Sequence, residues 1–299
     1  RFAIAFLDSS DPDFSAQGVV DLTSVMVLDL QNNTATAARV GFSANRVLFT
    51  YDGDGQANRA VVLSQNTVAV VDLFSSPPAV DVTFPLTLDP DSSVTPVGVE
   101  LTPDGQYALI SVAGKSDLYA LDLINHSVNM IELSGTPAAM VVNEATDQTL
   151  LVFSNAATAE VLTHDYFDVN AYDLDESMNQ IIQGDDFALL YSDQTNRNDL
   201  YHLDLATEKL IEYRLQQSAV SVHLAPTQDY AIALTRSAGM EVIDLANERQ
   251  QQFALEGVGV GISFSATDTS LHALLLHQET EYLYKYELYS GQAEEIELS

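Results

Sequence analysis

The chain has 299 residues, of which 46% are hydrophobic and none is cysteine. Without cysteine there is no disulfide bond, no thiolate nucleophile and no cysteine-ligated metal centre. The 43 acidic residues outnumber the 11 basic ones and give a formal net charge of −32. Nucleic acids and anionic membrane surfaces are therefore excluded as expected partners. No apolar run reaches the roughly 18 residues that a membrane helix needs, so membrane insertion is not expected.

Residues 98–133 predict four short strands, at 98–101, 107–112, 118–123 and 128–133. The first turn is Thr102-Pro-Asp-Gly105, in which proline fixes φ and glycine accepts a conformation that other residues avoid. Most of these strands are apolar on both faces, whereas a sheet with one wet face would alternate. Each sheet must therefore be covered on both sides.

An acidic residue followed by leucine ends the third strand of this unit, and the same mark returns along the chain. Seven marks, one of them a degenerate copy at His164-Asp165, run from residue 29 to residue 287 with a mean spacing of 43. They are counted at Asp29, Asp72, Asp122, Asp165, Asp204, Asp244 and Glu287. A period of this length is typical of a four-stranded propeller blade. The sequence predicts an all-β fold, a seven-bladed β-propeller of four-stranded antiparallel blades that forms a single domain over residues 1–299.

In chain order, the first blade is predicted at 1–7, 24–30 and 34–40, with a long loop between its first two strands. The later blades are predicted within 46–88, 98–133, 138–186, 180–215, 220–255 and 258–298. In the fourth blade, residues 165–186 either form the outer strand or protrude.

The first blade lacks one strand in this count, and an unpaired edge leaves backbone groups without partners. We expect residues 18–22, residues beyond either terminus, or a strand from another molecule to fill the gap. Residues beyond a terminus or a strand from another molecule are favoured over residues 18–22. The loop between Leu7 and Ser24 is short for a segment that must pass from the outer rim of the propeller to its axis and back. A protein partner could thus bind by strand addition at the first blade.

The repeat resembles that of YVTN-type seven-bladed propellers in its segments Thr102-Pro-Asp-Gly-Gln-Tyr-Ala-Leu-Ile110 and Glu241-Val-Ile-Asp-Leu245. The resemblance spans nearly the whole chain and is specific for architecture. It implies an extracytoplasmic protein: periplasmic, secreted or exposed at the cell surface. WD40 repeats have a similar length, but their signature dipeptide needs tryptophan, which this chain lacks.

One loop has the spacing of calcium ligands. Asp52, Asp54 and Asn58 present oxygen atoms at alternating positions, and Gly55 permits a sharp bend. The loop resembles the calcium loop of FG-GAP-type propeller repeats, although Thr50 and Asn58 stand where that pattern has carboxylates. An ordinary Asp-Gly hairpin turn accounts for the same residues. If the loop does bind a metal, the predicted ligands are Asp52, Asp54 and Asn58, and Ca²⁺ is the one expected cofactor.

The acidic residues at the strand ends, such as Asp122 and Asp244, are interpreted as caps that accept backbone N–H groups of the next turn. The sequence contains no motif of a serine hydrolase, a metalloprotease or a nucleotide-binding protein. No catalytic residue is predicted.

Two functions stay open. The first is a non-catalytic, extracytoplasmic module that binds protein partners or serves as a scaffold in a secreted or cell-surface assembly. The second is a lactonase-like hydrolase, in which Glu100, His223 and Asp186 would hold a divalent cation in the central channel. Convergence of these three side chains at one channel mouth would favour the hydrolase.

Overall fold

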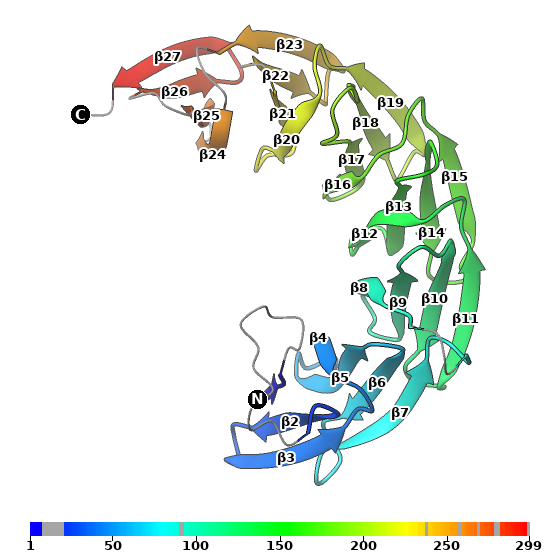
Figure 1. The fold of residues 1–299 in the computed structure, drawn as a ribbon. Coiled ribbons are helices and arrows are strands. Elements are labelled where there is room, and N and C mark those ends of the chain that lie inside the picture. The colour runs from blue at the N-terminus through cyan, green and yellow to red at the C-terminus, as the bar shows by residue number, and fades with distance from the viewer. Residues whose placement is uncertain are drawn as a thin grey trace. The chain divides into compact units, whose positions relative to one another are not determined.

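A computed structural model describes residues 1–7, 21–89, 93–236, 239–255, 259–267, 270–277 and 282–297. These residues contain 27 strands, which form seven antiparallel sheets of strands consecutive in the chain (Figure 1). We call the sheets blades one to seven in chain order.

The strands of the first three blades lie close to their predicted positions. Blade one comprises β1 (Phe2–Ala5), β2 (Ser24–Asp29) and β3 (Thr34–Arg39). Blade two comprises β4 (Ala44–Tyr51), β5 (Ala57–Ser64), β6 (Thr67–Asp72) and β7 (Ala79–Pro85). Blade three comprises β8 (Pro96–Leu101), β9 (Tyr107–Val112), β10 (Asp117–Asp122) and β11 (Ser127–Glu132).

The remaining blades each have four strands. Blade four comprises β12 (Pro137–Asn143), β13 (Gln148–Phe153), β14 (Thr158–Thr163) and β15 (Val169–Asp173). Blade five comprises β16 (Gln180–Gln183), β17 (Phe187–Tyr191), β18 (Asp199–Asp204) and β19 (Lys209–Arg214). Blade six comprises β20 (Ala219–Leu224), β21 (Tyr230–Thr235), β22 (Gly239–Asp244) and β23 (Arg249–Ala254). Blade seven comprises β24 (Gly259–Thr267), β25 (Ser270–His277), β26 (Tyr282–Glu287) and β27 (Gln292–Glu297).

The chain divides into two compact units. The first unit holds residues 1–147 and 163–168, and the second holds residues 148–162 and 169–299. Blades one to three belong to the first unit and blades five to seven to the second, while the division passes through blade four.

Burial follows the order of the strands within a blade. In blade three, β9 and β10 are buried along almost their whole length, whereas the fourth strand, β11, is mostly exposed. The apolar side chains of β9 and β10 pack with those of blade two in one core cluster, which includes Val61, Ile110 and Leu121. The middle strands are thus covered on both faces, which explains why their sequences do not alternate.

The turn between the first two strands has one geometry in blades three and six. The amide of Thr102 donates to the carbonyl of Tyr107 over 3.0 Å, and the amide of Ala225 donates to the carbonyl of Tyr230 over 2.8 Å. Gly105 and Gln228 occupy the same place in the two turns and have φ of +67° and +61°. The turns within residues 101–107 and 224–230 are therefore structurally equivalent.

Blade one contains three strands within the described residues, as the sequence predicted, with β1 paired to β2 alone. Most of the predicted loop between these strands, residues 8–20, lies outside the described residues, and so does most of the segment 18–22. The outer strand of blade four is β15, which resolves the two alternatives for the segment after residue 165.

Candidate binding face

The turns after the third strands are built on the acidic residues of the repeat. Asp122 accepts hydrogen bonds from the amides of Ile124 and Asn125, over 2.9 and 2.8 Å, and from the Asn125 side chain. Burial pushes the pKa of Asp122 upward, but these hydrogen bonds outweigh it and hold the pKa below its ordinary value. The same caps form at Asp29, Asp72, Asp204, Asp244 and Glu287. The interpretation of these residues as turn caps is confirmed.

A second constraint fixes the shape of the turn. The residue four positions after the cap has a positive φ of 52–69° in six blades. These residues are Asn33, His126, Phe167, Glu208, Glu248 and Gly291. Because both ends of the turn are fixed in this way, the residues between them point outward in a repeated arrangement.

Blade four departs from the repeat at this turn. Its third strand ends at Thr163, which takes the place of the acid, and His164 takes the place of the leucine. The predicted mark, counted at Asp165, is therefore two residues out of register. His164 is 7% exposed, and its Nδ1 lies 2.8 Å from Oδ1 of Asp147. A buried histidine with a carboxylate partner thus replaces the buried leucine.

Three consecutive turns expose large apolar side chains. Phe74 of blade two is 50% exposed, Ile124 of blade three 53% and Tyr166 of blade four 82%. Phe74 and Ile124 are the second residue after the cap, and Tyr166 is the third residue after Thr163. All three belong to the first unit. We call Phe74, Ile124 and Tyr166 the apolar turn row.

Contacts between neighbouring blades hold these turns in place. Nε2 of His126, in the turn of blade three, lies 3.0 Å from Oδ2 of Asp81 in blade two. The Phe167 ring, in the turn of blade four, meets the Tyr107 ring of blade three edge-on, with centroids 4.9 Å apart. The turns of blades three and four, which carry Ile124 and Tyr166, are thus each anchored on the preceding blade.

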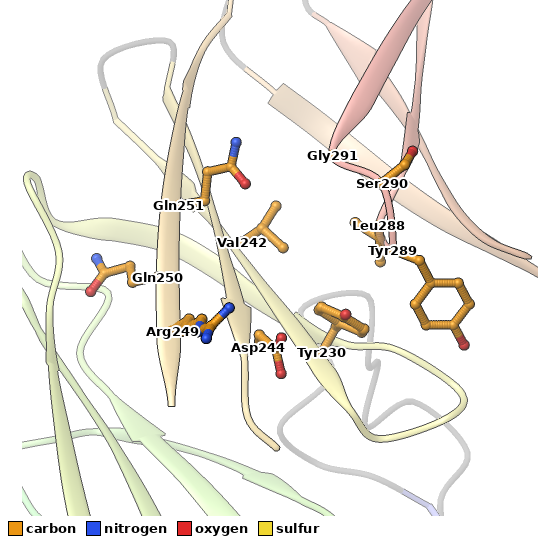
Figure 2. A pocket seen from close by; sticks show the side chains of 10 residues that line it. All are labelled: Tyr230, Val242, Asp244, Arg249, Gln250, Gln251, Leu288, Tyr289, Ser290 and Gly291. Atoms are coloured by element: carbon orange, nitrogen blue, oxygen red, sulfur yellow. The ribbon is translucent and has the colours of Figure 1, made fainter. Parts of the chain in front are cut away.

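The second unit has a related feature in blade seven. Glu287 accepts hydrogen bonds from the amides of Tyr289 and Ser290, and Tyr289 is 50% exposed at the offset of Phe74 and Ile124. Its ring lies 5.8 Å from that of Tyr230 at the start of β21. Figure 2 shows the two rings beside Asp244 and Arg249 in a pocket of about 410 Å³. Tyrosine and arginine are the side chains that dominate many protein interfaces.

Sequence reasoning missed the apolar turn row because the repeat marks were used to locate strands. The signal is present: aligning the caps at Asp72, Asp122 and Glu287 places Phe74, Ile124 and Tyr289 at one offset. Polar residues are the usual occupants of such turns, so a recurring large apolar residue is informative.

The predicted calcium loop is the turn between β4 and β5. Asp52 Oδ1 accepts hydrogen bonds from the amides of Asp54 and Gln56, over 3.0 and 2.8 Å. Asn58 Oδ1 accepts one from the Thr50 hydroxyl over 2.6 Å. Gly55 has φ of +72°, like Gly105 in the equivalent turn of blade three. These contacts match the hairpin alternative, and calcium at this loop stays a prediction.

The three residues named for the hydrolase alternative lie in different parts of the chain. Glu100 is in β8 of the first unit, His223 is in β20 of the second, and Asp186 is exposed in the turn before β17. Burial raises the pKa of Glu100 and lowers that of His223. Oγ of Ser221 lies 2.9 Å from Nε2 of His223.

The described residues contain no group of three or more histidine, aspartate or glutamate side chains arranged around a common metal position. In the same part of the chain, no helix has the length and apolar character needed to cross a membrane.

Neither a protein-family model nor a curated protein matches the chain. Its structure is similar to that of dihydro-heme d1 dehydrogenase NirN in complex with DHE, with a TM-score of 0.54 and 12% identity. That likeness covers 93% of this chain but 62% of NirN, so the chain spans less than two thirds of that protein's length. The WD40 domain of Neurospora crassa Pan2 matches with a TM-score of 0.48 and 13% identity over 84% of this chain and 79% of that one. Kuenenia stuttgartiensis hydrazine synthase matches with a TM-score of 0.48 and 12% identity, over 83% and 94% of the two chains.

The seven sheets of consecutive strands, together with the likeness to NirN over nearly the whole chain, define the fold class. The chain is a β-propeller of seven antiparallel blades. At this level of identity the likeness concerns the fold alone.

Proposed function

We propose that this protein is a non-catalytic β-propeller module that binds a protein partner through the apolar turn row. One observation carries the proposal: the turns after the third strands of three consecutive blades each expose a large apolar side chain, Phe74, Ile124 or Tyr166. An isolated exposed apolar side chain needs no explanation, but its recurrence in three consecutive blades is typical of a binding surface.

The charge of the chain defines the partner further. A net charge of −32 favours a partner whose contact surface is basic around an apolar centre. Tyr289 and Arg249 supply a second anchor point in the second unit, with Tyr230 as the floor of that pocket.

The setting proposed for this module is extracytoplasmic, in a secreted, periplasmic or cell-surface assembly. Its support is the resemblance of the repeat to the YVTN type, seen in segments such as Glu241-Val-Ile-Asp-Leu245. We propose the same repeat type for all seven blades and a single propeller domain for residues 1–299. Fractionation of the source cells tests the location.

Strand addition at blade one is a second proposed mode of binding. Within the described residues, β1 is paired on one side only, and Leu7 and Met26 beside it are 47% and 39% exposed. A pocket of about 420 Å³ lies at this apolar surface. A donated strand would satisfy the free edge of β1 and cover these side chains.

The test uses the immobilised protein and extracts of its source. A triple variant, Phe74→Ser, Ile124→Ser and Tyr166→Ser, removes the apolar turn row, while Met130→Ser removes an equally exposed apolar side chain from β11. A partner retained by the wild type and by Met130→Ser, released by salt, and lost by the triple variant supports the proposal. Equal retention by the triple variant contradicts it, and so does the lack of any partner specific to the wild type.

A further inference from the structure

A pocket of about 470 Å³ lies in the first unit, lined by the first strands of blades two, three and four. Four polar side chains line it: Arg46 from β4, Glu100 from β8, Ser111 from β9 and Thr136, the residue before β12. The remaining lining is mainly apolar and includes Val97 and Met140. A concave site of this size with few polar groups is typical of small-molecule binding.

Three of these four side chains lack a partner among the described residues: none forms a hydrogen bond or ion pair with the Glu100 carboxylate, the Arg46 guanidinium or the Ser111 hydroxyl. Thr136 does have a partner. Ser111 is only 2% exposed as a residue, and it lines the pocket. Polar groups in a folded protein are normally hydrogen-bonded, and those without a protein partner at a pocket indicate where a ligand would bind.

The backbone beside these groups is shaped to keep the pocket open. Gly98 lies between Ser111 and Met140, and a Cβ at this position would come within 2.5 Å of the Ser111 hydroxyl. Burial raises the pKa of Glu100, while the charge of Arg46 lowers it. Arg46 is therefore close enough for its charge to act on Glu100, although the two are not paired.

One carboxylate and one guanidinium, unpaired and within electrostatic reach of each other, are complementary to a ligand that carries both charges. We propose that this pocket binds a free α-amino acid with an apolar side chain. Its ammonium group contacts Glu100, its carboxylate contacts Arg46, and Ser111 donates a hydrogen bond to that carboxylate. Val97 and Met140 surround the apolar side chain.

The opposite charges also argue against a bare cation as the ligand. A divalent ion at Glu100 would be repelled by Arg46 and would find one carboxylate in place of the several oxygen ligands it prefers. A zwitterion uses both groups and adds no net charge to a chain of −32.

Calorimetric titration of the intact protein with L-leucine and L-phenylalanine tests the proposal. N-acetyl-L-leucine lacks the ammonium charge, L-leucine amide lacks the carboxylate, and glycine lacks the apolar side chain. Each should bind at least about tenfold more weakly than L-leucine, because each leaves one part of the pocket without its partner.

Two variants assign the contacts. Glu100→Gln should abolish the preference for L-leucine over its acetylated form, and Arg46→Gln should abolish the preference over the amide. Glu144→Gln, an exposed glutamate of the same unit, is the matched control and should leave binding unchanged.

Absence of leucine and phenylalanine binding overturns the proposal, as does equal binding of L-leucine and its two blocked forms. The analogue series needs the wild type alone, so the test stands even where a variant fails to fold. The outcome is independent of the partner proposed for the apolar turn row.

Discussion

Blades one and three contain the same turn but bury different amounts of it. Leu30 and Leu123 each follow the capping acid, Asp29 or Asp122, yet Leu30 is 60% exposed and Leu123 is fully buried. The leucines at this position in blades two, five, six and seven are at most 7% exposed. The acid therefore acts within its own turn, whereas the leucine depends on a neighbouring blade.

The core clusters show which neighbour is needed. Leu123 packs in a cluster shared by blades two and three, and Leu288 packs in a cluster shared by blades six and seven. The leucine of each blade is thus covered together with the blade before it. Leu30 of blade one is absent from the cluster that blades one and two share, and it lies at the surface.

The largest expected effect separates these two leucines. Leu123→Ala should lower the free energy of unfolding by about 2–5 kcal/mol, because it removes fully buried methyl groups and leaves a cavity. Leu30→Ala, the matched control, should change it by less than about 0.5 kcal/mol. Urea unfolding of the two variants measures the difference. Similar losses would show that Leu30 is covered in solution.

Hydrogen exchange extends the comparison to the strands. The amides of β1 should exchange at least about tenfold faster than those of β9, since β9 is paired on both sides and β1 on one. Mass spectrometry of amide exchange at the level of single peptides measures this. Equal protection of the two strands would mean that another segment pairs with β1.

Much of this architecture was predictable because the turns repeat chemically. The cap at Asp122 and the glycine at position 105 are local devices, and local devices are visible in a sequence. The burial of Leu123 and the exposure of Leu30 are not, since both leucines follow the same Leu-Asp pair and their burial depends on what packs on them. The Glu100 pocket was hidden for the same reason, because Arg46 reaches Glu100 through space from another blade.

Removal of the Arg1 side chain should change the pKa of the Asp29 cap in blade one and leave that of the Asp122 cap in blade three unchanged. The hydrogen bond from Arg1, with others from the Asn32 side chain and the backbone, lowers the pKa of Asp29 to about 2. Its stabilising effect is complete above the unfolded pKa of about 3.9 and is lost as the pH falls toward 2. In Arg1→Ala the pKa of Asp29 should rise by about one unit. The pKa of Asp122, which has no arginine partner, should stay constant.

Carboxyl-carbon NMR titration of the wild type and of Arg1→Ala measures both values in one experiment. An unchanged Asp29 would mean that the backbone hydrogen bonds of the turn alone set its pKa. The two caps would then be equivalent, and the difference between the blades would lie entirely in their packing.

The smallest expected effect concerns the last residue of this turn, which both blades hold at positive φ. Asn33 in blade one tolerates that conformation, and glycine takes it freely at Gly291 in blade seven, but Glu208 in blade five carries a Cβ that opposes it. Glu208→Gly should therefore raise the free energy of unfolding by up to about 1 kcal/mol, and Gly291→Ala should lower it by a similar amount.

The nearest atom to a Cβ at Gly291 is the Gln251 side-chain oxygen at 3.5 Å, an ordinary contact, so backbone strain alone is tested. Asn33→Gly is the control and should have almost no effect. Thermal unfolding of the three variants decides the matter, and a loss of stability in Glu208→Gly would show that the entropy of the unfolded glycine outweighs the strain that it relieves.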